Sequence, residues 1–600
     1  MTPAVPPDTA PGLAEAVRDA ALRRPDTTVM TFVDYAADRS GTTTELTYGG
    51  LDRRARAIAG ALGSLAAPGE RAAILCPHGA DYVVALLGCL YAGVLAVPLY
   101  APESLRPDDR PLLAMADCAP RVALTTRPYE ESVRGLLAGD AGAAAGRPEV
   151  VCVDAVDASG ADGAAPPAPA RPDDTAYLQY TSGSTRAPAG VLVTHRNLAV
   201  GVAQLARGLD IGDDAQIVGW LPFFHDMGLL FTVAVPLITG TPAVLMAPFA
   251  FIQQPVRWLR ALTAHRATHT VSPNFGLDLC VNRVAGRHRE GLDLSSLRCL
   301  VNGSEPVRAT TLERFTEAFA PYGFRARAHS PGYGLAEATL AVTLSGPGPA
   351  RVLTVDRKEL AADRVRPLPE GDTGGYRVVG CGTPADQELR IVDPRTGEPV
   401  AEDGVGEVWV RGANVCAGYW NRPERTAAVF RARPHPDGDD GRTWLRTGDL
   451  GFLRDGELYP TGRLKDLIVV DGRNHHPVDL ELTVEEAAPA VRRGHVAAFP
   501  VGLLDDAGER VVVVAELDRE REAGDQEAVR TAIRAAVLAR HSLELADVVL
   551  IRRGCLPKTT SGKVRRTACR DRYEDGSLKR AGTPTAPAAR AAAGEGTTAP

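Results

Sequence analysis

The chain has 600 residues, too many for one hydrophobic core, so we expect two or more domains. Its 45% hydrophobic and 24% charged residues are typical of a soluble globular protein, and its net charge of −7 gives no reason to expect nucleic acid as a partner. The ten cysteines include no C-x-x-C pair. This favours reduced thiols in the cytoplasm over a disulfide or zinc framework.

The first half of the chain alternates helical and strand patterns. Residues 1–11 are polar and rich in proline, lack the features of a signal peptide, and are expected to be disordered. Apolar residues from Leu51 to Leu62 fall on one helical face, and residues 72–76 read as a buried strand. The uncharged stretch 82–100 is long enough to cross a bilayer, but glycine and proline interrupt it. We predict a buried helix over about 80–92, a strand over 94–98, and no integral membrane contact.

A second compositional break lies at residues 462–466. Beyond it the pattern predicts strands over 495–499, 510–517 and 547–551, and a helix that aligns Val529, Ile533 and Val537. These elements suffice for a small α+β domain. The tail after about residue 575 is mostly Ala, Gly, Pro and Thr, and we expect it to be disordered.

The first chemical motif is YTSGSTRAPAGV, residues 180–191. Hydroxyl side chains crowd around one glycine, and such a loop can offer backbone N–H groups and hydroxyls to phosphate oxygens. The residues concerned are Thr181, Ser182, Gly183, Ser184 and Thr185. The loop is not a Walker A motif, because the Gly-Lys-Ser/Thr ending is missing. Alone, such a segment is more typical of a linker.

Further motifs follow in a fixed order: LPFFHDMGLL (221–230), VNGSEPV (301–307), GYGLAEATL (332–340), WLRTGDLG (444–451), GRLKD (462–466) and LPKTTSGKVRR (556–566). Together they resemble the adenylate-forming superfamily of acyl-CoA synthetases, peptide-synthetase adenylation domains and luciferases. The resemblance spans about residues 12–575. One departure is Ala189, where many members of the superfamily have lysine.

Within the superfamily the chain looks most like the fatty acyl-AMP ligases. The features that point there are DYAADRSGTTTELTYGGLDRRARAIAGAL, GCLYAGVLAVPLYAP, SPNFGLDLC, NHHPVDLELTVEEAAPAVR and an extra segment over about 349–376. In that family, an insertion at this place is associated with restricted domain motion and with rejection of coenzyme A. The alternative is an ordinary surface loop.

The resemblance implies an α/β fold in two parts. The first is a large multi-subdomain adenylating domain over 12–464, with α/β layers, a small β-barrel-like part, the fatty-acid tunnel and the ATP site. The second is a small, mobile α+β domain over 465–575, followed by a disordered tail over 576–600. Lys465 is the expected hinge.

The resemblance also assigns chemical roles. Lys563 would bridge the fatty acid carboxylate and the phosphoryl oxygens of ATP, and Glu337 would be the Mg²⁺ ligand. Asp449 would accept hydrogen bonds from the ribose hydroxyls, and Arg463 would contact ribose or phosphate. The remaining residues expected around the nucleotide are Gly303, Ser304, Glu305, Gly332, Tyr333, Gly334, Leu335 and Ala336.

The acyl pocket is expected to involve Asp226, Asn274 and Phe275, with His225 at its carboxylate end as a further catalytic residue. An alternative of equal weight is that His225 is a hydrogen-bonded histidine of the core with no role in the reaction.

The sequence therefore predicts ATP- and Mg²⁺-dependent conversion of a medium- or long-chain fatty acid to acyl-AMP. The acyl group would then pass to the phosphopantetheine thiol of a holo acyl carrier protein of a polyketide or peptide synthase. The runner-up is a fatty acyl-CoA ligase. An amino acid activator, a luciferase-like oxidoreductase and an inactive nucleotide-binding module are further alternatives.

Overall fold

The computed structural model describes residues 11–102, 110–159, 170–180, 188–435, 441–502, 509–518, 524–559 and 562–581. The chain divides into two compact units. The first comprises residues 1–467 with 560–563, and the second comprises 468–559 with 564–600. The second unit thus begins three residues after the predicted start at Lys465. Each unit is described separately below.

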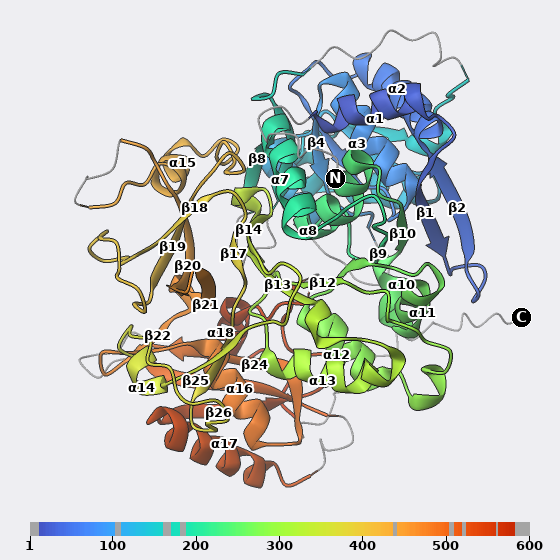
Figure 1. The fold of residues 1–600 in the computed structure, drawn as a ribbon. Helices are drawn as coiled ribbons and strands as arrows, with labels where there is room; N and C mark the ends of the chain where they lie inside the picture. The colour runs from blue at the N-terminus through green and yellow to red at the C-terminus, as the bar shows by residue number, and fades with distance from the viewer. Residues whose placement is uncertain are drawn as a thin grey trace, which may run out of the picture. The chain divides into compact units, whose positions relative to one another are not determined.

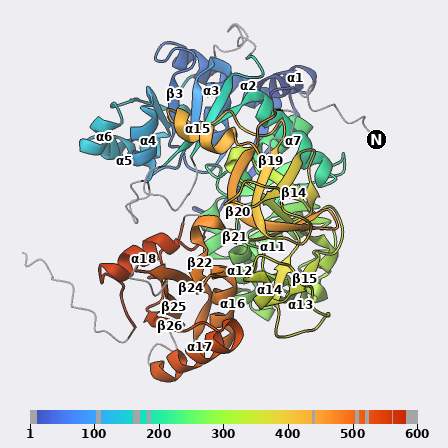
Figure 2. The same ribbon diagram turned by 90° about the vertical axis from the view of Figure 1, so that its left-hand side faces the viewer.

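One of the sheets of the first unit has six strands, which are parallel except at one edge. Its strands run in the order β6 (Glu149–Cys152), β5 (Val122–Thr125), β3 (Arg71–Ile74), β4 (Leu95–Pro98), β7 (Thr175–Tyr180) and β8 (Gly190–Thr194), and β8 is antiparallel to β7. On one face lie α2 (Tyr48–Gly63) and α3 (Ala80–Ala92), with α1 (Leu13–Arg23) beside α2 (Figure 1). On the other lie α4 (Arg110–Cys118), α5 (Arg127–Leu137) and α6 (Asp140–Ala144), which group together in Figure 2.

Strand alternation explains why both faces of this sheet are covered. Ala72 and Ile74 belong to the apolar cluster that includes α2 and α3, whereas Ala73 belongs to the cluster that includes α4 and α5. The uncharged stretch 82–100 is divided between α3 and β4, and Gly93 ends α3 in the left-handed conformation at φ 66°. The predicted helix and strand are confirmed. Among the described helices, none is both long and apolar enough to span a bilayer.

A nine-stranded sheet forms the middle of the first unit. Its order is β17 (Thr383–Pro384), β14 (Ala341–Leu344), β13 (His329–Gly334), β12 (Cys299–Asn302), β11 (His269–Val271), β9 (Ile217–Gly219), β10 (Ala243–Met246), β1 (Thr28–Asp34) and β2 (Thr42–Thr47). The strands from β13 to β1 are parallel, and the edges are antiparallel. Its helices are α7 (His195–Gly208), α8 (Asp226–Leu229), η4 (Leu230–Ala234), α9 (Val235–Thr239), α10 (Pro248–Gln253), α11 (Val256–Ala264), α12 (Asn274–Arg283) and α13 (Ala309–Phe319).

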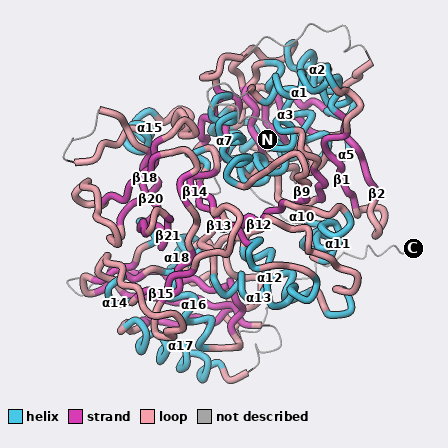
Figure 3. The backbone as a smooth tube through the Cα atoms, viewed as in Figure 1, coloured by secondary structure: helices cyan, strands magenta, loops and turns pink. Residues whose placement is uncertain are grey.

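The predicted β-barrel-like part is a four-stranded antiparallel sheet. It contains β18 (Glu388–Val392), β19 (Gly406–Arg411), β20 (Leu445–Arg454) and β21 (Glu457–Arg463), with α15 (Pro423–Phe430) as its helix (Figure 3). The predicted insertion, residues 349–376, contains β15 (Val352–Val355) and α14 (Arg357–Leu360). It ends at the first residue of β16 (Tyr376–Val379), which pairs with β15.

The second unit has its own core. The hairpin of β22 (Ile468–Val470) and β23 (Arg473–His475) precedes α16 (Pro477–Ala487), and the sheet consists of β24 (Val491–Val501), β25 (Arg510–Leu517) and β26 (Leu545–Ile551). The crossover helix α17 (Gln526–His541) joins the parallel pair β25 and β26, and α18 (Arg566–Glu574) follows. This arrangement agrees with the predicted α+β elements.

The start of the predicted disordered tail is ordered. Ala581 N–H donates to Leu550 O at 2.8 Å, and Arg580 forms an isolated bridge with Ile551. Residues up to 581 therefore satisfy backbone groups at the edge of β26, which composition does not reveal. Residues 1–10 and 582–600 lie outside the described part of the chain.

Candidate active site

The segment after β9 ends in His225 and Asp226, where a continuous helical run begins. Asp226 Oδ1 accepts the Met227 N–H at 2.7 Å and lies 2.7 Å from His225 Nδ1. Burial raises the pKa of Asp226, but the His225 imidazole and Lys563 outweigh it and the net pKa is lowered. The helical run widens to a π-turn at Leu230–Ala234, a local feature frequent at functional sites. The Met227 N–H thus bonds to Asp226 Oδ1 and also lies 3.3 Å from His225 Nδ1, which holds the two predicted side chains together.

Gly303, Ser304 and Glu305 follow directly after β12. Ser304 has φ 70°, a conformation that costs energy for a residue other than glycine, and its Oγ donates to Met227 Sδ at 3.7 Å. This contact brings the loop against the helix that follows Asp226. Glu305 Oε1 is buried and has no hydrogen-bond partner among the described residues.

A tight turn after β13 presents Glu337. A Cβ atom on Gly334 would lie 1.8 Å from Leu340 O, so the turn requires glycine there. Thr339 has φ 66° and is held by a 2.7 Å hydrogen bond from its Oγ1 to Asn414 O. Leu335 and Ala336 lie between Gly334 and Glu337, and Leu335 N–H donates to Leu340 O at 2.9 Å. The strained turn fixes the direction of the Glu337 side chain.

The Glu337 carboxylate has a partner from a distant segment. Tyr419 Oη donates to Glu337 Oε1 at 2.7 Å. Burial raises the pKa of Glu337, and the Tyr419 hydrogen bond opposes that effect. Tyr419 is itself held by its N–H to Thr426 Oγ1 at 2.9 Å and by the Arg425 guanidinium 4.5 Å over its ring. The sequence analysis missed Tyr419, because no spacing rule links positions 82 apart.

Tyr333, Asp449 and Arg463 converge. Tyr333 Oη donates to Asp449 Oδ2 at 2.8 Å, and Arg463 Nε lies 3.2 Å from Asp449 Oδ1. Asp449 and Arg463 are direct partners across β20 and β21, so strand register brings them together. Asp449 raises the pKa of Arg463, and burial together with Asp449 raises the pKa of Tyr333. Both oxygens of Asp449 thus have protein partners, which the motifs did not reveal.

The two predicted functional lysines belong to the first unit. Lys465 lies in η9 (Leu464–Asp466), and residues 560–563 are grouped with this unit although both flanking segments belong to the second. Burial lowers the pKa of Lys563, as does Arg463, while Asp226, Glu305 and Asp449 act in the opposite direction. Burial also lowers the pKa of Lys465. These are two of only five lysines among 67 basic residues.

Within the second unit, two buried carboxylates hold the chain on either side of the Lys563 segment. Glu516 accepts a hydrogen bond from the Leu556 N–H at 2.8 Å. The two carboxylate oxygens of Glu481 accept hydrogen bonds from Arg566 Nε and Nη2, at 2.7 Å each. A paired fork of this kind fixes direction as well as distance.

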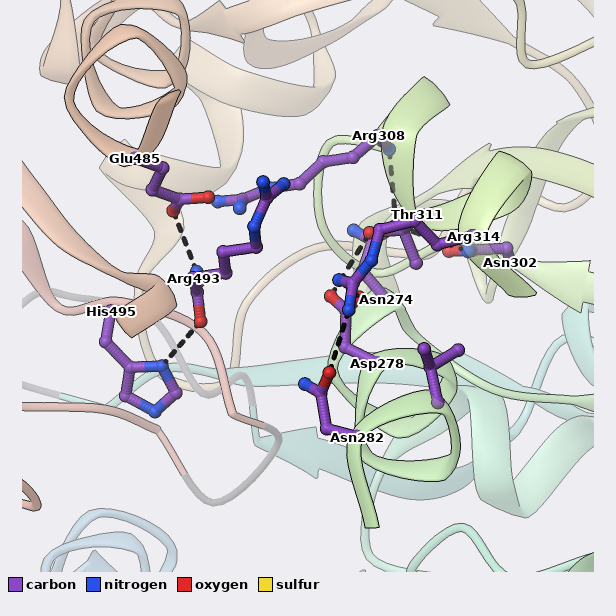
Figure 4. Close-up of polar contacts among 12 residues, drawn as sticks. Asn274, Asp278, Asn282, Asn302, Arg308, Thr311, Arg314, Glu485, Arg493 and His495 are labelled. Carbon is purple, nitrogen blue, oxygen red and sulfur yellow. Dashed lines mark hydrogen bonds and ion pairs between the residues drawn. The ribbon is translucent and has the colours of Figure 1, made fainter. Parts of the chain in front are cut away.

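Asn274 serves mainly as a brace in this structure (Figure 4). Its Nδ2 donates to Pro306 O at 2.9 Å, and its Oδ1 accepts from Asn302 Nδ2 at 3.3 Å and from Arg308 N at 3.2 Å. The side chain therefore holds the loop that contains Gly303 and Glu305. One turn further along α12, Asp278 bonds to Thr311 and Arg314 on α13. Phe275 packs edge-on to Trp220 at 5.7 Å.

The predicted phosphate loop, Thr181, Ser182, Gly183, Ser184 and Thr185, lies outside the described residues. Ala189 is buried just before β8. Within the described part of the chain, no three His, Cys, Asp or Glu side chains are grouped so as to hold a metal ion.

The chain is similar to known proteins over most of its length. A family model described as AMP-binding enzyme matches residues 17–420, and one described as Disco-interacting protein 2-like, AMP domain, matches residues 465–582. A 4-hydroxyphenylalkanoate adenylyltransferase of Mycobacterium tuberculosis is 42% identical, over 94% of this chain and 91% of that protein. The long-chain-fatty-acid–AMP ligase FadD26 of Mycobacterium marinum is 40% identical, over 96% and 99%.

Solved structures are similar over the same length. The fatty acid AMP ligase from Legionella pneumophila is 36% identical with a TM-score of 0.72, covering 95% of this chain and 97% of that one. A fatty acyl-adenylate ligase from L. pneumophila in complex with acyl adenylate and pyrophosphate has the same identity and TM-score, covering 94% and 96%.

Proposed function

We propose a reaction for this chain from one premise: it belongs to the AMP-binding enzyme family, and within that family to the fatty acyl-AMP ligases. The proposed reaction joins the carboxylate of a medium- or long-chain fatty acid to the α-phosphorus of ATP, giving acyl-AMP and pyrophosphate. The observation that carries it is the set of charged residues around Asp449. Tyr333 and Arg463 bond to that carboxylate, and the negative charges of Asp226, Glu305 and Asp449 act against burial to raise the pKa of Lys563.

Both reactants are anions, so the site must neutralise charge and fix geometry. Lys563 is the proposed cation between the carboxylate and the phosphoryl oxygens, where it stabilises the transition state more than either separated reactant. Asp449 and Arg463 are proposed to hold the ribose and phosphate. Thr181–Thr185, Gly303–Glu305 and Gly332–Ala336 are proposed to line the nucleotide site.

Glu337 is the proposed Mg²⁺ ligand. Mg²⁺ prefers one or two carboxylates together with phosphate oxygens and water, so a single, partly buried carboxylate with one oxygen fixed by Tyr419 fits it. When bound, Mg²⁺ would withdraw charge from the phosphates. His225 is proposed to position the carboxylate end of the acyl pocket, with Asp226 orienting its ring through the 2.7 Å contact at Nδ1.

The proposed acceptor is the phosphopantetheine thiol of a holo acyl carrier protein of a polyketide or peptide synthase. We propose Lys465 as the hinge that allows the second unit to change its position between the two half-reactions. The hairpin over 349–376 is proposed to disfavour coenzyme A. The runner-up is a fatty acyl-CoA ligase. The cytoplasm is the proposed compartment, supported by ten free cysteines.

A second substrate class has its own support. The relative that is 42% identical is named for 4-hydroxyphenylalkanoates rather than for fatty acids. We therefore include acids that end in a hydroxylated ring as candidate substrates.

The deciding experiment is pyrophosphate release with a panel of carboxylic acids, with holo carrier protein or coenzyme A as acceptor. We expect acid-dependent release and acyl transfer to the carrier protein. Robust acyl-CoA formation would favour the runner-up, and no acid-dependent release would reject the adenylation proposal.

Lys563→Ala tests the proposed cation. Adenylation should fall at least about a hundredfold, since one well-placed charge contributes about 3 kcal/mol to a transition state. Transfer from preformed acyl-adenylate to the carrier thiol should largely survive. Equal loss of both half-reactions in a folded variant would contradict the role given to Lys563.

A further inference from the structure

Residues 413–420 form a connecting segment that has partners on two sides within the first unit. On one side, Trp420 N–H donates to Gly190 O at 2.8 Å, at the start of β8. On the other side, Cys416 N–H donates to Glu337 O at 2.9 Å. The helix α7 lies beside both β8 and β14, the strand that follows the Glu337 turn (Figure 1). The connecting segment thus joins the strand after the predicted phosphate loop to the residue proposed to bind Mg²⁺.

Asn197, in the first turn of α7, holds the connecting segment from the side of β8. Its side chain is buried, and Nδ2 donates to Ala413 O at 2.9 Å and to Val415 O at 3.1 Å. Its Oδ1 accepts the Thr194 N–H at 3.0 Å, and Thr194 Oγ1 accepts the Asn197 N–H at 3.1 Å. Because Thr194 is the last residue of β8, one amide side chain fixes the connecting segment to the end of that strand.

Asn414 holds the Glu337 turn from within the connecting segment. Its side chain is fully buried, and Nδ2 donates to Ala338 O at 3.0 Å and to Ala341 O at 3.1 Å. Its Oδ1 has no partner among the described residues, so the side chain serves as a donor. Thr339, whose φ of 66° costs free energy, donates through Oγ1 to Asn414 O at 2.7 Å. Such a conformation persists only where its surroundings fix it.

We propose that Asn197 and Asn414 are positioning residues that fix the Glu337 carboxylate relative to β8. The inference rests on the proposed function, in which Glu337 binds Mg²⁺ beside the phosphates of ATP. Both amide groups donate to backbone carbonyls, so their influence on Glu337 passes through the main chain. Mg²⁺ demands nearly ideal octahedral geometry, and a displaced carboxylate therefore binds it less well.

The test measures binding of Mn²⁺, as a substitute for Mg²⁺, by electron paramagnetic resonance in the presence of a non-hydrolysable ATP analogue. Asn414→Ala leaves two buried carbonyls without this donor and allows the turn to relax, so Mn²⁺ binding should weaken at least about tenfold. The KM for ATP in the pyrophosphate-release assay should rise by a similar factor, while the KM for the fatty acid stays the same. Asn197→Asp keeps the acceptor for Thr194 N–H, removes both donors and should act in the same direction.

Thr47→Ala is the control for a general loss of stability. Thr47 Oγ1 accepts the Gly50 N–H at 3.2 Å at the start of α2. Its removal should lower the unfolding temperature without changing Mn²⁺ affinity. Weakened Mn²⁺ binding in this control, or unchanged binding in the folded asparagine variants, would overturn the inference. If Asn414→Ala does not fold, Asn197→Asp decides.

Combination with Glu337→Gln shows whether the asparagines act through Glu337. Glu337→Gln alone should weaken Mn²⁺ binding, and adding Asn197→Asp or Asn414→Ala should cause no further loss. A further, additive loss would overturn the positioning role. Failure of the Mg²⁺ proposal has a different signature: Glu337→Gln would then keep full Mn²⁺ affinity, and the inference would fall with it. Failure of the adenylation proposal would appear as no acid-dependent pyrophosphate release by the unmodified chain.

Discussion

At the scale of single residues, the carboxylate of Glu337 depends on the hydroxyl of Tyr419. Burial alone favours the neutral acid, and the 2.7 Å hydrogen bond favours the carboxylate that a divalent cation needs. Tyr419 is held from two further sides, by Thr426 and Arg425. Tyr419 therefore positions a proposed metal ligand without being one.

Replacing Tyr419 with phenylalanine removes the hydroxyl and keeps the ring. Binding of Mn²⁺, used as a spectroscopic substitute for Mg²⁺ in the presence of a non-hydrolysable ATP analogue, should weaken about tenfold, because a hydrogen bond to a charged group contributes about 1.5 kcal/mol. Electron paramagnetic resonance titration measures this directly. Tyr573→Phe removes a similar hydroxyl–carboxylate bond, to Asp547 in the second unit, and should leave Mn²⁺ affinity unchanged. Equal affinities in the Tyr419→Phe and unmodified chains would reject this role.

At the scale of elements, the insertion over 349–376 is an ordered hairpin. Asp356 caps α14, and the side chains of Val355, Leu360 and Tyr376 are buried. Arg377 pairs with Glu313 on α13, and Arg351 lies 3.2 Å from the buried Glu457 at the start of β21. The segment is thus attached to two neighbouring elements of the first unit, which an ordinary surface loop does not require.

Excision of residues 350–376 tests the proposed link to acceptor choice. If the hairpin disfavours coenzyme A, acyl-CoA formation should rise at least about tenfold, which corresponds to about 1.4 kcal/mol. Acid-dependent pyrophosphate release should stay within about threefold, and thermal unfolding monitors the fold. Arg377→Ala, which loosens only the attachment to α13, should give a smaller increase. Continued rejection of coenzyme A by an excised chain that still adenylates would show that acceptor choice lies elsewhere.

The sequence predicted elements best where apolar runs are uninterrupted. The helix α3 and the strand β25 match their predicted ranges. For β24, the prediction began at His495, four residues late, because Arg492 and Arg493 break the apolar pattern. Arg492 is accommodated in the strand by its 2.9 Å ion pair with the buried Glu516. Such compensation depends on tertiary structure and has no local signal.

The same reasoning applies to the site. Motifs led to the prediction that Glu337, Tyr333, Asp449 and Arg463 belong to the nucleotide site. They gave no sign of the hydrogen bonds from Tyr419 to Glu337 and from Tyr333 to Asp449, which join distant segments. The bracing role of Asn274 could not be predicted either, because its partners belong to the loop after β12.

At the scale of the whole molecule, the two units have separate cores. Ile468, Leu480, Val513 and Ile533 belong to an apolar cluster drawn entirely from the second unit, and this unit also buries His476. Neither ring nitrogen of His476 has a partner among the described residues, and burial lowers its pKa from 6.5 to about 4. Two cores of this kind should give more than one unfolding transition.

Acid should destabilise the second unit through His476. The imidazole of the unfolded chain takes up a proton near pH 6.5, whereas that of the folded chain does so only near pH 4. Because the unfolded chain binds more protons between these values, the free energy of unfolding decreases as the pH falls from 6.5 to 4, and this contribution is constant above pH 6.5. Between pH 7 and pH 5 the loss should be about 2 kcal/mol. His476→Phe should remove that part of the loss, measured by denaturant titration at both pH values. The exposed His288→Phe is the control, and an unchanged pH dependence in His476→Phe would contradict the prediction.

The scarcity of lysine has a consequence for chemical self-damage. An acyl-adenylate is a mixed anhydride that acylates free amines, whereas guanidinium groups stay protonated and do not react. With five lysines among 67 basic residues, the chain obtains nearly all of its positive charge from arginine and offers its own product few nucleophiles. Burial lowers the pKa of two of the five, Lys563 and Lys465, which favours the neutral amine at each. Lys563, the residue proposed to accelerate the first step, is thus also an amine open to capture by the intermediate.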